Sequence, residues 1–134
     1  MTSQNFGALH HVELWVPDLA RARTEWGWLL AALGYGPFQD WPAGQSWRRG
    51  SAYIVVEESP DLGSRSHRRT DAGLNHLAFW AGSREQVDAL ALAAPAHGWT
   101  ELFPERYPHA GGSGHFAAYL VNSDGFEVEL IAEE

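Results

Sequence analysis

A short apolar segment that begins with histidine occurs twice in this chain. Residues 11–16 read HVELWV and residues 76–81 read HLAFWA, and in both a Trp follows the His by four positions. A β-strand turns alternate side chains to opposite faces, so His and Trp share a face in each copy. The alternation predicts two equivalent strands.

A helical pattern follows each of these segments. Apolar residues recur at helical spacing over residues 18–33 and again over residues 83–94, where Ser83 opens a capping box. Gly34 and Pro95 then end the two helices. Each helix has one apolar side, which predicts that it packs on a sheet.

Further strand-like runs complete two equivalent halves. They cover residues 34–40, 45–49 and 51–58 in the first half, and residues 99–103, 115–121 and 126–132 in the second. We expect a single domain with one module over about residues 8–58, a linker over 59–72 and a second module over about 73–132. Duplication places recurring residues near the axis that relates the halves.

Composition narrows the class of protein. A length of 134 residues suits one domain, and 45% hydrophobic with 19% charged residues fits a globular chain. No run reaches the length of a membrane span, and residues 1–8 lack the features of a signal peptide, so we expect a cytoplasmic protein without a membrane partner. The net charge of −8 argues against nucleic acid as a partner and leaves small molecules.

The recurring polar residues form a candidate metal site. His11 and His76 open the repeated strands, while Glu57 and Glu129 lie near the ends of the two halves. A buried carboxylate needs a partner, and one divalent cation would satisfy all four side chains if they converge. The chain has no Cys, so the ligands are nitrogen and oxygen, which suits Ni, Zn, Co, Mn or Fe(II).

Neighbouring residues compete for these roles. Alternation along the strand turns His10 to the face opposite His11, so the repeat selects His11. Glu58 competes with Glu57, and Glu127 shares a face with Glu129.

Other segments allow two interpretations each. The seven Trp residues suit either a core of large side chains or a cleft with aromatic walls. The Gly-rich segment 105–114 suits a lid or a long hairpin turn, and its Tyr107 and His109 are candidates for substrate contact. Arg65, Arg68 and Arg69, around His67, are interpreted as solvated, and closure over an anionic ligand is the alternative. His115 is interpreted as a structural residue.

Three motifs together resemble the vicinal oxygen chelate superfamily, which includes glyoxalases, bleomycin resistance proteins and extradiol dioxygenases. They are LHHVELWVPDL at residues 9–19, GLNHLAF at residues 73–79 and DGFEVELI at residues 124–131. The resemblance covers about residues 8–132. It implies an α+β fold in which two βαβββ modules form an open, cupped, eight-stranded mixed barrel around a metal, and it implies a homodimer.

The resemblance also assigns ligand positions. His11, His76 and Glu129 match ligands of the family's metal enzymes, and Glu57 falls on the fourth position, where the flanking match is weakest. The family's lyases for glutathione adducts usually carry an Arg four residues after the first ligand.

The chain has Trp15 at that position, which counts against lactoylglutathione as the substrate. It implies instead an apolar or aromatic ligand that faces Trp15 and Trp80.

The function we expect is that of a metal-dependent glyoxalase-like lyase or isomerase. Its substrate would carry vicinal oxygens, and Glu57 or Glu129 would act as the general base. A drug- or metabolite-binding resistance-type protein without catalysis is an alternative, and so is an Fe(II) dioxygenase or thiol transferase. A genuine fourth ligand at Glu57 would tell against oxygen activation.

Overall fold

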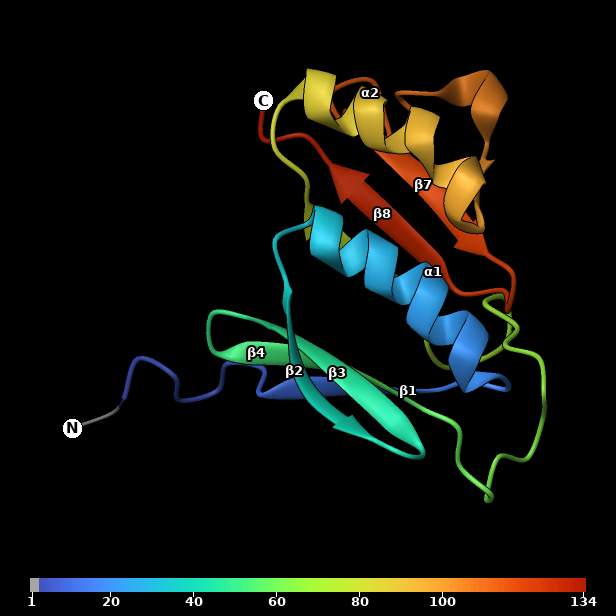
Figure 1. Cartoon of the computed structure of the whole chain (residues 1–134). Helices are drawn as coiled ribbons and strands as arrows, with labels where there is room; N and C mark the ends of the chain where they lie inside the picture. Colours follow the sequence, from blue (N-terminus) through green and yellow to red (C-terminus); the bar gives the residue numbers. More distant parts are fainter. Residues whose placement is uncertain (1–2) are drawn as a thin grey trace. The chain divides into compact units, whose positions relative to one another are not determined.

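The structure, a computed structural model, describes residues 3–134. This part of the chain forms two compact units. The first unit ends at Gly63 and the second runs from Ser64 to Glu134. We call them module 1 and module 2. Each contains one four-stranded mixed sheet and one α-helix (Figure 1).

Module 1 has the element order β, α, β, β, β. Its elements are β1 (His11–Trp15), α1 (Leu19–Ala32), β2 (Gly36–Trp41), β3 (Gly44–Arg49) and β4 (Ala52–Glu57). The strand order is β1-β4-β3-β2, with β1 parallel to β4 and the other pairs antiparallel. The parallel pair is possible because α1 makes the crossover between β1 and the hairpins.

Helix α1 begins where two acidic side chains accept backbone N–H groups. Asp18 Oδ1 accepts from Arg21 at 2.9 Å, and Glu58 Oε1 accepts from Leu19 at 2.8 Å. These bonds satisfy donors that have no partner within the helix. Trp26 is fully buried on the apolar side of α1, which packs on β3 and β4. Trp47 and Trp99 are also buried, so three of the seven Trp residues belong to the core.

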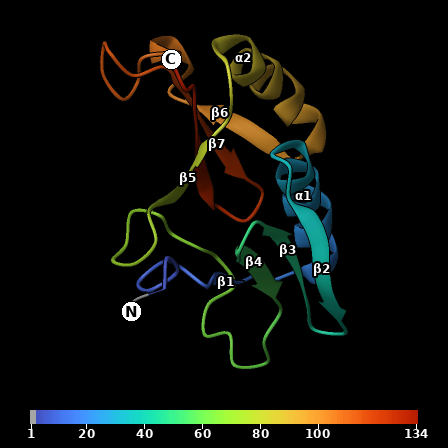
Figure 2. The same ribbon diagram turned by 90° about the vertical axis from the view of Figure 1, so that its left-hand side faces the viewer.

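Module 2 repeats this order. Its elements are β5 (His76–Trp80), α2 (Arg84–Ala93), β6 (Trp99–Leu102), β7 (Ala117–Asn122) and β8 (Glu127–Ile131), with short 3-10 helices at Ala94–His97 and Pro104–Arg106. The strand order is β5-β8-β7-β6, and β5 is parallel to β8. Helix α2 starts with the capping box of Ser83 and Gln86, and it packs on β7 (Figure 2).

The α+β fold of two βαβββ modules is confirmed, together with both predicted helices. β7 starts later than predicted. It begins at Ala117 and not at His115, because His115 N–H bonds to Gly112 O at 3.1 Å and closes a turn there. The single domain and the barrel into which the modules would close stay predictions. No helix within residues 3–134 has the length and apolar character needed to cross a membrane.

Candidate functional site

The two predicted histidine ligands hold equivalent positions in their modules. His11 opens β1 and pairs with Tyr53 of the parallel strand β4, while His76 opens β5 and pairs with Glu127 of the parallel strand β8. Along β1, His11 is exposed and Leu14 is buried, so His11 lies on the face of its sheet that α1 does not cover. We call the side of the first sheet that carries His11 the polar face of module 1. The side of the second sheet that carries His76 is the polar face of module 2.

The carboxylate of Glu129 is the centre of a polar cluster on module 2. His76 Nε2 lies 3.1 Å from Glu129 Oε1, and His115 Nε2 lies 2.5 Å from Oε2. The Tyr119 hydroxyl donates to Oε2 at 3.0 Å. Glu129 is only 7% exposed, so His115 and Tyr119 take the place of water at Oε2. We call these four residues the Glu129 cluster.

Tyr119 is held in its protonated form in this cluster. Burial raises its pKa to about 12, and the hydrogen bond to Glu129 and the negative charges of Glu129 and Glu127 act in the same direction. The hydroxyl is therefore a hydrogen-bond donor to Glu129 across the physiological range.

Gly111 lets the Gly-rich segment lie against this cluster. A Cβ at Gly111 would stand 2.5 Å from the Tyr119 hydroxyl oxygen and 2.7 Å from Cδ2 of His115. Any side chain would overlap both residues. The segment thus covers Glu129 from the side of His115.

Asn75 sets the orientation of the His76 ring. Its Oδ1 lies 2.7 Å from His76 Nδ1, and because an amide oxygen only accepts, Nδ1 carries the proton. A neutral His76 then presents the lone pair of Nε2 to Glu129 Oε1. Two acceptors that face each other repel unless a proton or a cation lies between them. A metal ion bound to both side chains would remove this repulsion.

A second buried acid, Glu127, lies beside His76 on the polar face of module 2. Glu127 is 4% exposed, and its Oε1 lies 3.1 Å from Arg69 Nη1. Arg69 belongs to the segment before β5, which the sequence predicted to be solvated. That interpretation is wrong for Arg69 and holds for Arg68, whose ion pair with Asp71 is exposed.

Glu57 does not hold the position in module 1 that Glu129 holds in module 2. In module 2, Glu129 lies opposite Ala78, which is two residues after His76. The equivalent residue of module 1, two positions after His11, is Glu13, and it lies opposite Val55. Glu57 lies opposite Trp15 instead.

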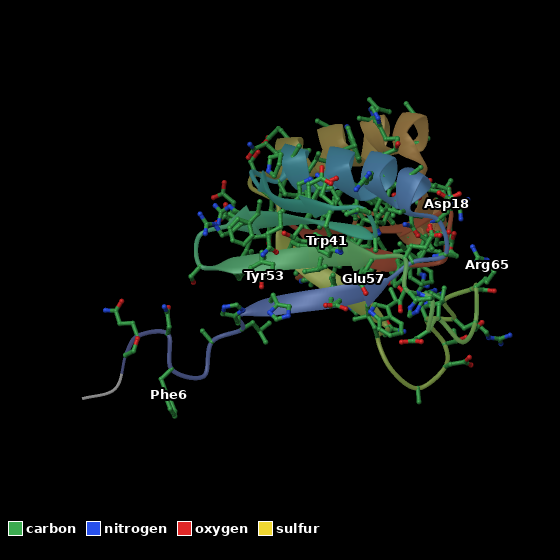
Figure 3. The ribbon with its side chains drawn as sticks, turned by 60° about the horizontal axis from the view of Figure 1, so that its bottom comes forward. Phe6, Asp18, Trp41, Tyr53, Glu57 and Arg65 are labelled. Atoms are coloured by element: carbon green, nitrogen blue, oxygen red, sulfur yellow. The ribbon has the colours of Figure 1, made fainter. Side chains whose placement is uncertain are left out.

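Four residue steps along the strand, roughly 13 Å at 3.3 Å each, therefore separate Glu57 from the level of His11. Figure 3 shows Tyr53, the partner of His11, and Glu57 toward opposite ends of β4. The expected convergence of His11 with Glu57 is thus corrected, since the acid comes two residues too late in the strand. The competing Glu58 caps α1 through its bond to Leu19 and is not available either.

His10 also departs from the prediction. It precedes β1, where the alternation has not yet begun, and its Nδ1 lies 2.9 Å from Nδ1 of His11. Its ring also meets Tyr53 edge-on, at 5.3 Å between ring centroids. Both imidazoles therefore lie next to Tyr53, contrary to the expectation that His10 turns away.

The predicted substrate contacts fall in different places. Trp15 and Trp80 end β1 and β5, each four residues after its histidine, with exposed fractions of 40% and 70%. Tyr107 donates its hydroxyl to Asp88 of α2, which ties it to the helix, and burial together with Asp88 raises its pKa. His109 Nδ1 lies 3.2 Å from the carbonyl oxygen of His115. Contact of these residues with a substrate stays a prediction.

Three members of this site could not be found from the repeat. His115, Tyr119 and Asn75 have no counterparts in the sequence of module 1 at matching positions. Alternation along residues 115–121 does put His115 and Tyr119 on one face, and this was the available signal. Within residues 3–134, no three His, Asp or Glu side chains are arranged to hold one metal ion. Of the four predicted ligands, His76 and Glu129 are the two that module 2 brings together, at 3.1 Å.

Known proteins resemble this chain over nearly its whole length. A family model described as Glyoxalase/Bleomycin resistance protein/Dioxygenase superfamily matches residues 10–119. Uncharacterized protein YqjT of Bacillus subtilis (strain 168) is 43% identical over 126 residues, which are 92% of this chain and 98% of that protein.

Solved structures agree. A candidate glyoxalase from Bacillus halodurans has 39% identity and a TM-score of 0.90, with 96% of this chain and 97% of that chain covered. The fosfomycin resistance protein FosX of Listeria monocytogenes, solved with Mn(II) and a sulfate ion, shares the fold at a TM-score of 0.63 and 19% identity, with 96% and 91% covered. The chain belongs to the glyoxalase/bleomycin resistance protein/dioxygenase superfamily.

Proposed function

We propose that this protein is a metal-dependent enzyme of the glyoxalase-like type, in which His11, His76 and Glu129 bind a divalent cation. Its substrate is a small molecule with two adjacent oxygens. The observation that carries the proposal is the approach of His76 Nε2 to Glu129 Oε1 at 3.1 Å, with Asn75 holding the other ring nitrogen. When bound, such a cation supplies Lewis acidity and a template for substrate oxygens.

The surroundings of Glu129 divide the work between its two oxygens. Oε2 faces His115 and Tyr119, so Oε1 is the oxygen left toward His76 and the cation. Hydrogen bonds from His115 and Tyr119 to the oxygen that does not face the cation fix the orientation of this ligand.

Glu129 is also the general base that we propose. It accepts a proton from the carbon next to a substrate carbonyl and later returns it to the product, while His115 Nε2 and the Tyr119 hydroxyl donate to Oε2 and hold the carboxylate in place. The first of these transfers is an enolisation, the step shared by lyase and isomerase reactions of this type.

Oxygen chemistry with Fe(II) is a second candidate, and Val55 favours it. Val55 stands where the fourth, acidic ligand was expected, opposite Glu13. Two His and one carboxylate then remain, which is the ligand set of non-haem Fe(II) oxygenases. Oxygen uptake with catechols in the presence of Fe(II) separates this candidate from the first.

Metal binding to purified protein tests the proposal. The chelator-treated chain is titrated with Mn(II), Fe(II), Co(II), Ni(II) and Zn(II), and bound metal is measured by mass spectrometry. We expect one ion per chain, and its loss in His11→Ala, His76→Ala and Glu129→Gln. A chain that binds none of these ions contradicts the proposal and leaves a ligand-binding protein without catalysis.

Glu57→Gln is the matched control, since it changes an acid on the polar face that the register keeps away from His11. It should retain the metal. The homodimer and the cytoplasmic location are part of the same proposal, and native mass spectrometry and cell fractionation test them.

A further inference from the structure

Four side chains form a continuous row across the polar face of module 1, starting at His11. The ring of Tyr53 on β4 stacks on His11 with 4.9 Å between centroids and 6° between planes. The ring of Phe38 on β2 lies 5.1 Å from that of Tyr53, and the guanidinium carbon of Arg48 on β3 lies 4.3 Å from the centroid of Phe38. We call these four residues the aromatic subsite.

We propose that the aromatic subsite binds a flat aromatic acid, with the ring on Tyr53 and Phe38 and the anionic group on Arg48. The aromatic subsite would set the substrate class of the proposed enzyme. It rests on the proposed function only for the role of His11 as a metal ligand.

Phe38 lies at a β-bulge on this face. Pro37 pairs with Trp47, which is buried on the side of α1. Gln39 pairs with Ser46. Ser46 lies on the polar face because it is opposite Val55. The register shifts between Pro37 and Gln39, so Phe38 and Gln39 both face the polar side. Strict alternation from Pro37 puts Phe38 on the polar face, and the shift adds Gln39 to the same face.

Bulges are common next to binding sites. Phe38 belongs to this bulge and is 41% exposed. An exposed aromatic ring at a bulge contributes little to the core, which favours a role in binding.

The charge of Arg48 selects the kind of ligand. Arg48 is exposed, and within residues 3–134 no carboxylate forms an ion pair with it. A guanidinium held against an aromatic ring keeps its donors free for a carboxylate or phosphate. In a chain of net charge −8, this local positive charge is what would attract an anion.

The spacing of the strands sets the length of the ligand. His11, Tyr53 and Arg48 lie on neighbouring strands β1, β4 and β3 at one level of the sheet. Two spacings between strands amount to about 10 Å. A substrate that places its vicinal oxygens at His11 therefore carries its acid group at the far side of an aromatic ring.

A pair of probes that differ only in charge tests the subsite. 2-Naphthoate and 2-naphthamide have nearly the same shape, and their binding to the full chain is measured by titration calorimetry without added metal. We expect the acid to bind more tightly, by about tenfold, the scale of one charge-assisted hydrogen-bonded contact. Arg48→Gln should remove this preference, and Phe38→Ala should weaken both probes.

Arg49→Gln is the control, because Arg49 follows Arg48 on the same strand and faces the other side of the sheet. It should leave both affinities unchanged. Equal binding of the two probes, an equal effect of Arg49→Gln, or no binding of either probe would overturn the proposal. Circular dichroism of each variant confirms that it is folded.

The result is independent of the metal experiment. A chain that binds metal and does not distinguish the probes loses the aromatic subsite alone. A chain that prefers the acid and binds no metal loses the proposed function alone.

Discussion

His115 Nε2 lies 2.5 Å from Oε2 of Glu129 and joins a residue before β7 to one within β8. Glu129 is buried, whereas the side chain of His115 is 36% exposed. The side chain of His76 is 32% exposed, so both imidazoles beside this carboxylate are in contact with solvent.

Removing His115 should destabilise the metal-free protein. In His115→Ala the buried Glu129 carboxylate keeps the hydrogen bond from Tyr119 and loses its shortest contact. Loss of a bond to a buried charged group costs about 1–3 kcal/mol, which urea denaturation measures. Tyr119→Phe should cost about 1 kcal/mol, the value of an ordinary hydrogen bond. Unchanged stability in both variants would show that water already satisfies Glu129.

Gly111→Ala should disturb the Glu129 cluster without touching Glu129. The added methyl group overlaps the Tyr119 hydroxyl and the ring of His115, so the segment must move away from both. We expect lower stability and weaker metal binding than in the wild type. Gly114→Ala is the control, since a Cβ there meets nothing within 4 Å. Equal effects of the two substitutions would mean that Gly111 matters only for chain flexibility.

Stability should fall as Glu101 ionises. Burial raises the pKa of Glu101 above its ordinary 4.5, and within residues 3–134 its buried Oε1 has no hydrogen-bond partner. The folded chain therefore holds the proton more tightly than the unfolded chain does. This contribution to stability is complete below the ordinary pKa and is lost as the pH rises through the raised pKa.

Glu101→Gln mimics the protonated acid and does not ionise. The difference in free energy of unfolding between this variant and the wild type should therefore rise in favour of the variant from mildly acidic to neutral pH. Above that range the difference should stay constant. Urea denaturation at a series of pH values measures the difference. A difference that stays constant with pH would contradict the raised pKa.

Local patterns made the helices and histidine positions predictable. His11 and His76 recur in phase with strand alternation, and Ser83 caps α2 as its neighbours in sequence dictate. Features of this kind depend on residues a few positions apart, so the sequence carries them directly.

The register between distant strands could not be predicted in the same way. The pairing of β1 with β4 is fixed by buried residues such as Leu14 and Val56, which lie opposite each other, and the acid at the strand end has no part in it. Glu57 was therefore assigned two residues out of register. The bulge after Pro37 and the path that brings Arg69 to Glu127 leave no periodic signal either.

Arg69 and Glu127 supply the last prediction. Their ion pair, at 3.1 Å, neutralises a buried acid beside His76 and anchors the segment before β5, where Asn75 Nδ2 also donates to Arg69 O at 2.9 Å. Arg69→Gln leaves Glu127 buried and without its cation. Removal of one partner of a buried pair costs about 3–5 kcal/mol, and because Arg69 is partly exposed we expect about 2–3 kcal/mol in urea denaturation.

The double variant Arg69→Gln/Glu127→Gln should recover much of this loss, because no unpaired charge remains in the sheet. Arg68→Gln is the matched control: its ion pair with Asp71 is exposed, so its removal should change stability by less than about 0.5 kcal/mol. The segment before β5 also positions Asn75, which orients His76, so Arg69→Gln should weaken metal binding while Arg68→Gln should not. If both arginine variants lose metal equally, the effect comes from net charge, and the anchoring role of Arg69 is refuted.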